Sequence, residues 1–355
     1  MTLLRGYIVM AVFRGVALAL AVIVAIYGSI DLVSQLHDLG TGGYGFPQVV
    51  SYVLLRLPRK IFDTLPAAAL IGSLLSLGNL AVHRELVVMR ASGISSLQLL
   101  GTVGLAGIGL AVLMALIGES LAPSLTGYAD EMRQQALHSD TGETSGPATW
   151  LRDGDRILSV GRQTAELGYG GGVLLFELGP EQTLKEVARA DSADIDAQSR
   201  WVLTNYAETS FLENGVATNS AREATQTYSL DPNLLVSVVR EDRLDTPALW
   251  RYIRYLKDNS LASKHYEIAF WTRLASVASV VVMTVLALPF VFGSLRSAAA
   301  GSRLLVGLVI GLGYYMLSEV LASSGEVFNV DPAIVAWAPS AVLLVATAVL
   351  VARVR

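Results

Sequence analysis

Three cations stand close together directly before a long apolar stretch of the sequence. Arg56, Arg59 and Lys60 precede an apolar run that covers 61–82. Arginine binds phosphate through paired, charge-assisted hydrogen bonds, and lysine binds it as a point charge. A charge held at membrane depth is costly and often marks a binding site, although long cationic side chains also extend to the membrane surface. The cluster indicates either a site for anionic groups or cations that reach the interface, and the sequence leaves both open.

The sequence lacks the residue patterns of most catalytic and nucleotide-binding sites. None of the four lysines follows a glycine, so no glycine-rich phosphate loop is present. The four histidines are far apart and form no His-Glu-x-x-His pair, and the absence of cysteine excludes disulfides and thiolate metal sites. We therefore expect a chain that is not an enzyme and has no catalytic residues, metal or cofactor. Any ATP and Mg would be bound by a separate partner.

Two acidic residues lie near the ends of apolar runs. Glu119 and Glu319 are expected to be solvated there, with a proton relay as the alternative. The net charge of −4 provides no basic excess, which argues against nucleic-acid binding.

A short link between two apolar runs has the pattern of a docking helix. In 83–94, Leu86, Met89 and Arg90 share one face at helical spacing, Glu85 stands near the start, and Gly93 suits a helix end. Such a helix can insert into a groove of another protein or lie against lipid headgroups. Both interpretations are open at this point.

The elements that must position these residues are mainly membrane helices. Of the 355 residues, 53% are hydrophobic and only 16% are charged, with a mean hydropathy of +0.51. A span needs about 20 apolar residues in a helix, which satisfies its own backbone hydrogen bonds in lipid. Six segments meet this length: 15–36, 61–82, 97–121, 268–292, 304–321 and 334–352. We interpret the first as a retained helix rather than a cleaved signal peptide, because five more spans follow.

Arginines in the short loops predict the orientation of the spans. They occur before the first span, between spans two and three, between spans four and five, and at the end: Arg5, Arg14, Arg84, Arg90, Arg296, Arg303, Arg353 and Arg355. The loops 37–46 and 323–332 contain neither lysine nor arginine. By the positive-inside rule both termini are cytoplasmic and the domain between spans three and four is periplasmic.

That domain is expected to be all-β. Alternating segments at 149–160, 172–178, 185–195, 200–212 and 216–228 predict strands, with turns at Asp153-Gly154 and Asn214-Gly215. Short strands without intervening helices favour a β-sandwich or jelly roll. A helix over 246–258, capped by Thr246, is expected to lie at the membrane interface or to connect to span four. The predicted organisation is 1–122 for spans one to three with the link helix 83–94, 123–264 for the β domain, and 265–355 for spans four to six.

The stretch Glu85-Leu-Val-Val-Met-x-Ala-Ser-Gly93 resembles the coupling-helix signature of the lipopolysaccharide export permeases, the LptF/LptG family, and is most similar to its LptG members. Further similarities run along the chain: Arg5-Gly-Tyr-Ile, Gln35-Leu36 followed by Gly40, Leu65-Pro66-x-Ala68-Ala69-Leu70, Gly118-Glu119-x3-Pro123 and Phe292-Gly293-x-Leu295-Arg296-Ser297. The resemblance implies six membrane helices in two halves of three with an inserted periplasmic jelly roll, in the inner membrane.

The resemblance also implies a function and partners. The chain would be the permease subunit of an ABC transporter that extracts lipopolysaccharide for transport to the outer membrane. It would pair with LptF, be driven by an LptB ATPase dimer and associate with LptC. Glu85 would contact an arginine-rich groove of the ATPase, with Leu86, Met89, Arg90 and Gly93 completing the coupling segment.

Lipopolysaccharide carries phosphates, so its binding residues should include cations. Arg133 matches a family position at the outer rim, and Arg56, Arg59, Lys60 and His37 are further candidates. The chain departs from the family where lysines follow the first span, because Ser34–Asp38 contains none. We hypothesise that Arg56, Arg59 and Lys60 compensate. A permease for another lipid or lipoprotein and a non-transporting scaffold or sensor are the alternatives, and the missing catalytic set disfavours a peptidase.

Overall fold

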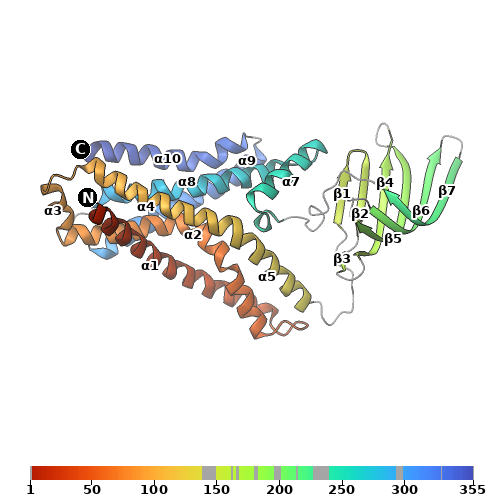
Figure 1. The fold of residues 1–355 in the computed structure, drawn as a ribbon, viewed down its shortest axis with the longest axis horizontal. Coiled ribbons are helices and arrows are strands. Elements are labelled where there is room, and N and C mark those ends of the chain that lie inside the picture. Colours follow the sequence, from red (N-terminus) through yellow and green to blue (C-terminus); the bar gives the residue numbers. More distant parts are fainter. Residues whose placement is uncertain are drawn as a thin grey trace. The chain divides into compact units, whose positions relative to one another are not determined.

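The computed structural model describes residues 2–137, 149–160, 163–164, 168–179, 183–195, 201–212, 215–226, 240–292, 299–328 and 330–354. Predictions that rest on Asn214, Arg296, Arg355 or the stretch 293–298 lie outside these residues. The chain forms two compact units (Figure 1). The membrane unit comprises Met1–Leu137, Asp245–Leu249 and Ser263–Arg355, and the β unit comprises His138–Leu244 and Trp250–Ala262.

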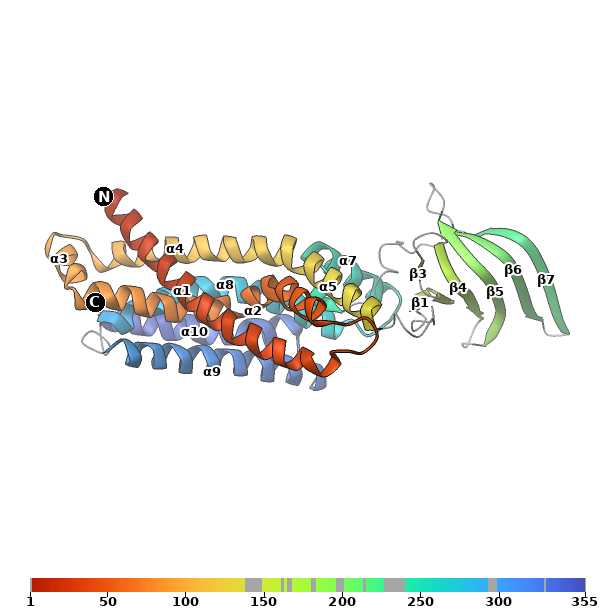
Figure 2. The ribbon, with the colours of Figure 1, turned by 90° about the horizontal axis from the view of Figure 1, so that it is seen from below.

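The membrane unit contains six helical segments that are long and apolar enough to cross a membrane, which confirms the six predicted spans. Its helices are α1 (Thr2–Gln35), α2 (Phe46–Val82), α3 (Glu85–Ala91), α4 (Ser96–Leu116), α5 (Ala122–Leu137), α8 (Lys264–Phe292), α9 (Ala300–Val327) and α10 (Pro332–Val354). A π-helical turn, η2 (Ile117–Leu121), joins α4 to α5, and a 3-10 turn, η1 (Leu36–Asp38), follows α1. In both views α3 lies at the end of the unit that holds the two chain ends (Figures 1 and 2).

The core of the membrane unit is organised around α2. Small residues let other helices approach α2 closely. A Cβ added at Gly15 of α1 would lie 2.5 Å from the carbonyl oxygen of Gly72 in α2. On the α9 side, a Cβ added at Gly307 would lie 2.9 Å from Cγ1 of Ile71 in α2. The small residues therefore serve contacts within this chain.

Two helices extend well beyond the apolar runs that predicted them. α2 begins at Phe46, so Arg56, Arg59 and Lys60 lie within a helix rather than before one. The third span continues through η2 and α5 to Leu137, whereas the β domain was predicted to start at 123. The predicted runs stop short because Arg56, Arg59 and Lys60 interrupt the apolar part of α2, and because α5 is polar along much of its length. Helical backbone hydrogen bonding continues through both segments, and hydropathy does not detect it.

The β unit is a single antiparallel sheet in the residues described. Its strands are β1 (Thr149–Asp153), β2 (Arg156–Val160), β3 (Gln163–Thr164), β4 (Gly168–Leu178), β5 (Leu184–Ile195), β6 (Trp201–Leu212) and β7 (Gly215–Gln226). They are ordered β1-β2-β4-β5-β6-β7, with β3 on β4, so neighbours follow the chain. Gly154, at φ +61°, makes the predicted turn between β1 and β2. The jelly roll stays a prediction.

A helix leads from the β unit back to the membrane unit. α7 spans Thr246–Asp258, the predicted residues, and follows the 3-10 turn η4 (Glu241–Arg243). Asp245, not Thr246, caps it, because the Asp245 Oδ1 accepts the Ala248 amide at 2.8 Å. The Thr246 hydroxyl has another partner.

Candidate functional site

The link between spans two and three is a short helix held between two sharp turns. Arg84 has a left-handed backbone, with φ of +61°, and α3 starts at the next residue. At the other end Gly93 has φ of +90°, and the Ile94 amide donates to the Met89 carbonyl at 3.2 Å. Glycine adopts this backbone without strain, which explains the helix end at this position.

The apolar face of α3 is packed inside the chain. Leu86 is only 2% exposed and Met89 only 8%, and both belong to the core cluster that includes Ile8 of α1. The docking role of these two side chains stays a prediction, since both are covered by their own chain in this structure. The exposed apolar residues of α3 are Val87 and Val88, at 43% and 62%. Periodicity identified the apolar face correctly but could not show what covers it.

The two ends of α3 are attached to different spans. The hydroxyl of Tyr7, on α1, donates to Oε2 of Glu85 at 2.9 Å. Arg90 places its guanidinium 5.4 Å from the centre of the Phe292 ring, at the end of α8. Tyr7 was not among the predicted site residues, although it stands in the Arg5-Gly-Tyr-Ile stretch. A movement of α3 would therefore act on spans one and four together.

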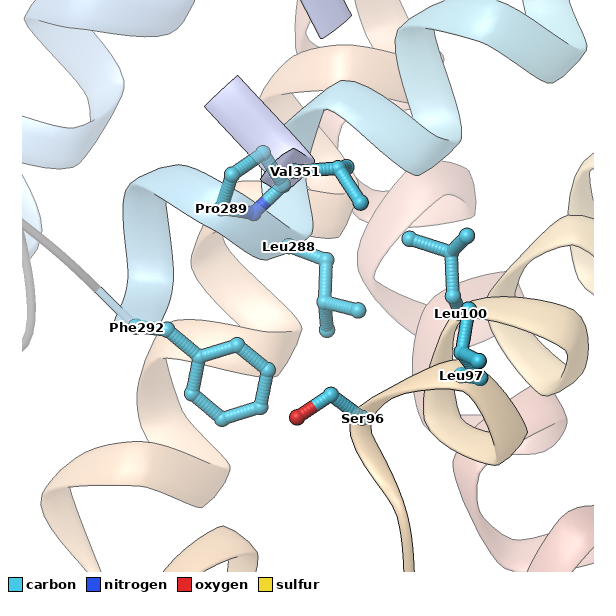
Figure 3. A pocket seen from close by; sticks show the side chains of 7 residues that line it. All are labelled: Ser96, Leu97, Leu100, Leu288, Pro289, Phe292 and Val351. Carbon is cyan, nitrogen blue, oxygen red and sulfur yellow. The ribbon is translucent and has the colours of Figure 1, made fainter. Parts of the chain in front are cut away.

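An apolar hollow includes Phe292, the residue that Arg90 of α3 contacts. It is lined by Ser96, Leu97, Leu100, Leu288, Pro289, Phe292 and Val351, from the ends of α4, α8 and α10 (Figure 3). The lining contains a single hydroxyl and no charged group, so it offers nothing that would bind phosphate. The hollow is therefore not the substrate site that the cations predict.

Those cations lie at the opposite end of the helices, in a network that connects α1, α2 and α5. Arg133 donates from Nη2 to Asp38 at 2.6 Å and from Nε to Gln35 at 3.1 Å. Arg56 donates to the Tyr52 hydroxyl at 2.7 Å. The Tyr52 hydroxyl in turn donates to Asp130 at 3.3 Å. We call these six residues the rim network: Gln35, Asp38, Tyr52, Arg56, Asp130 and Arg133.

Tyr52 connects the two predicted cationic groups. Both Arg56 and Arg133 stack over its ring, at 5.4 and 5.8 Å from the centroid. The neighbouring Tyr44 donates to Gln35 at 3.4 Å, and burial raises the pKa of the Tyr44 hydroxyl while Arg133 opposes that shift. The Tyr44 hydroxyl therefore remains a neutral donor at physiological pH.

The two other predicted cations each pair with a carboxylate. Lys60 lies 3.4 Å from Asp31 of α1, and Arg59 lies 3.2 Å from Asp63 on its own helix. His37 is exposed in η1. The predicted basic rim is thus a mixed-charge surface. Asp31 and Asp38 are distant in sequence from the cations they pair with, whereas Asp63 is only four residues from Arg59.

Among the residues described, no three histidine, aspartate or glutamate side chains are grouped to hold a metal ion. Six apolar helices in two sets of three, separated by a β insertion, define a polytopic membrane protein with an inserted β domain. The chain belongs to the LptF/LptG family of lipopolysaccharide export system permeases, whose model matches residues 6–353.

Two curated relatives match over nearly their whole length. The lipopolysaccharide export system permease protein LptG of Escherichia coli (strain K12) is 31% identical over 341 residues, which cover 95% of this chain and 94% of the relative. The protein of the same name from Haemophilus influenzae is 28% identical over 354 residues, 99% of each chain.

Proposed function

We propose that this chain is the membrane-spanning subunit of an ABC transporter that extracts lipopolysaccharide from the inner membrane for transport to the outer membrane. It pairs with LptF, associates with LptC, and is driven by a separate LptB ATPase dimer that binds ATP and Mg. The full-length family match and the names of the relatives support this proposal. The observation that carries the coupling role is α3, which is fixed to the core through Leu86 and Met89 yet exposes Val87 and Val88.

The orientation follows from the arginines. Arg84 precedes α3, Arg90 lies on it, and Arg5 lies in the first turn of α1, which starts at the same end of the membrane unit (Figure 1). The positive-inside rule predicts that this end is cytoplasmic. The rim network and the β domain are then periplasmic. In this orientation α3 meets a cytoplasmic ATPase, and the rim network meets a substrate leaving on the periplasmic side.

Each end has a chemical task. Glu85 offers a carboxylate to arginines of the ATPase, beside the apolar Val87 and Val88, and Gly93 permits the turn that returns the chain to the membrane. At the rim, Arg133 binds one carboxylate oxygen of Asp38. A substrate phosphate would offer the same guanidinium a bidentate acceptor, so the arginine could exchange one anion for another without becoming unpaired.

Replacing Glu85 with alanine tests the coupling role. Loss of a charge-assisted hydrogen bond costs roughly 1.5–3 kcal/mol, so the affinity for the ATPase should fall by at least about tenfold. The measurement is titration of the purified LptB dimer against the chain with LptF in nanodiscs, followed by ATP-dependent lipopolysaccharide release. Glu131→Ala, which removes an exposed acid on α5, is the matched control. Wild-type affinity in Glu85→Ala would exclude docking through this carboxylate.

The hypothesis that Arg56, Arg59 and Lys60 replace the missing lysines has its own test. Changing all three to glutamate places three anions where lipopolysaccharide phosphates would bind, and we expect lipopolysaccharide release to fall to background. The charge-conserving triple variant Arg56→Lys, Arg59→Lys and Lys60→Arg should retain most of it. Unchanged release in the glutamate variant would eliminate the idea that these residues compensate.

A further inference from the structure

The third membrane segment changes its winding near the middle. α4 ends at Leu116, and η2 forms one π-helical turn before α5 begins. The Ala122 amide donates to the carbonyl of Ile117, five residues earlier. Such a turn holds an extra residue compared with an α-helical turn, and it occurs frequently at functional sites.

The local sequence permits this turn. Pro123 has no amide hydrogen, so the carbonyls that precede it lack one helical donor. Ser120 donates its hydroxyl to the carbonyl of Leu116 at 2.5 Å. Gly118 lies under the Phe62 ring of α2, where an added Cβ would be 2.5 Å from Cε2. These features loosen the helix, but only the Phe62 contact reaches another element.

Glu119 ties the turn to two further elements. Its carboxylate accepts the backbone amide of Thr246 at 2.9 Å and also the Thr246 hydroxyl. Arg273, a buried cation of α8, donates to the same hydroxyl at 3.3 Å. The sequence predicted a solvated acid at the end of a helix, whereas Glu119 is hydrogen-bonded at the start of α7. A partly buried acid beside a buried arginine in a membrane segment is typical of a functional role.

The winding of η2 sets the rotation of everything after it. Losing the extra residue would turn α5 by about 100° and shift it by about 1.5 Å along its axis. α5 contacts the first two spans and the loop between them at three places that depend on its present rotation. Arg133 reaches Asp38 at 2.6 Å, Asp130 accepts from Tyr52 at 3.3 Å, and the Ala136 carbonyl accepts the Gly43 amide at 2.8 Å.

We propose that Glu119 is a positioning residue for Arg133. By holding the π-turn against the start of α7, it fixes the rotation of α5 and directs Arg133 into the rim network. The role of Arg133 toward lipopolysaccharide phosphates rests on the proposed function, whereas the rotation of α5 is tested independently of it.

The natural absence of cysteine allows a direct measurement of this rotation. The hydrogen bond between Gly43 and Ala136 brings their backbones close enough for a disulfide between Gly43→Cys and Ala136→Cys. In this background we compare Glu119→Ala, deletion of Ser120, and the control Glu131→Ala. Deletion of Ser120 removes one residue from the turn while leaving the Glu119 side chain in the chain. Thr246→Val, which loses the hydroxyl but keeps the amide, provides a milder change.

We expect Glu119→Ala and the Ser120 deletion to lower the disulfide yield by roughly a factor of five, because either change allows α5 to rotate away from Gly43. Thr246→Val should lower it by about a factor of two, because one of two hydrogen bonds remains. The yield is measured on folded protein that elutes as a single species in detergent. A wild-type yield in Glu119→Ala would overturn the proposal, even if deletion of Ser120 reduces it.

Lipopolysaccharide release distinguishes the positioning role of Glu119 from the role of Arg133 toward substrate. If Glu119 positions Arg133 for substrate, Glu119→Ala should reduce release to the same extent as Arg133→Ala, and the double variant should be no worse than either. Loss of the disulfide with normal release in both single variants would retain the rotation of α5 and overturn the role of Arg133 in the proposed function. Reduced release with an intact disulfide would overturn the positioning role.

Discussion

Replacing Gly72 with leucine will separate the first two membrane spans and abolish accumulation of the folded chain. A Cβ at this position would lie 2.5 Å from the backbone nitrogen of Val16 and 2.6 Å from the carbonyl carbon of Gly15. These are backbone atoms of α1, so no side-chain rotation relieves the clash. Overpacking a core costs about 1–3 kcal/mol even where side chains can adjust, and here an entire helix must move.

The expected result is a loss of more than about 90% of the monodisperse protein recovered in detergent, since even a few kcal/mol exceeds much of a typical stability. Gly101→Leu is the matched control. It also adds an isobutyl group to a membrane helix, but no atom lies within 4 Å of its Cβ position. The yield of Gly72→Ala should fall between the yields of Gly72→Leu and Gly101→Leu. Equal yields of Gly72→Leu and Gly101→Leu would show that α1 and α2 do not approach each other in this way.

The sequence predicts those parts of the fold that local patterns encode. Apolar runs of sufficient length identify the six spans, and the alternation of charge and apolar residues places the helix over 246–258. Hydropathy does not predict the extent of α2 and α5, because three cations interrupt the apolar residues of α2 and α5 is polar along much of its length.

The contacts of the candidate site are harder to predict than its elements. Tyr7 and Glu85 are 78 residues apart, and Arg133 and Asp38 are 95 apart, so only the completed fold brings them together. The π-turn at Glu119 likewise depends on Thr246, which is 127 residues away. A single sequence supplies the residue types for such pairs but no information about which of them meet.

Packing and docking can be tested separately on α3, because Leu86 and Met89 are buried whereas Val87 and Val88 are exposed. Truncating Leu86 to alanine leaves a cavity in the core cluster, and such changes cost roughly 2–5 kcal/mol. We therefore expect Leu86→Ala to unfold at a clearly lower temperature in detergent. Protein that remains folded should still bind the ATPase, because the side chain is covered by its own chain.

Val88→Asp should have the opposite result. Val88 is 62% exposed, and surface substitutions away from special features usually change stability by about 0.5 kcal/mol or less. The unfolding temperature should therefore stay near that of the wild type, while a new charge on the proposed docking surface should prevent recovery of the ATPase with the chain. Val87→Ala removes only two methyl groups from the same surface. It should have a small effect on the unfolding temperature and on recovery of the ATPase. If Val88→Asp instead retained the ATPase while Leu86→Ala lost it at a temperature where the chain is folded, the buried face would be the one that docks. In that case α3 would have to leave the core cluster before it met its partner.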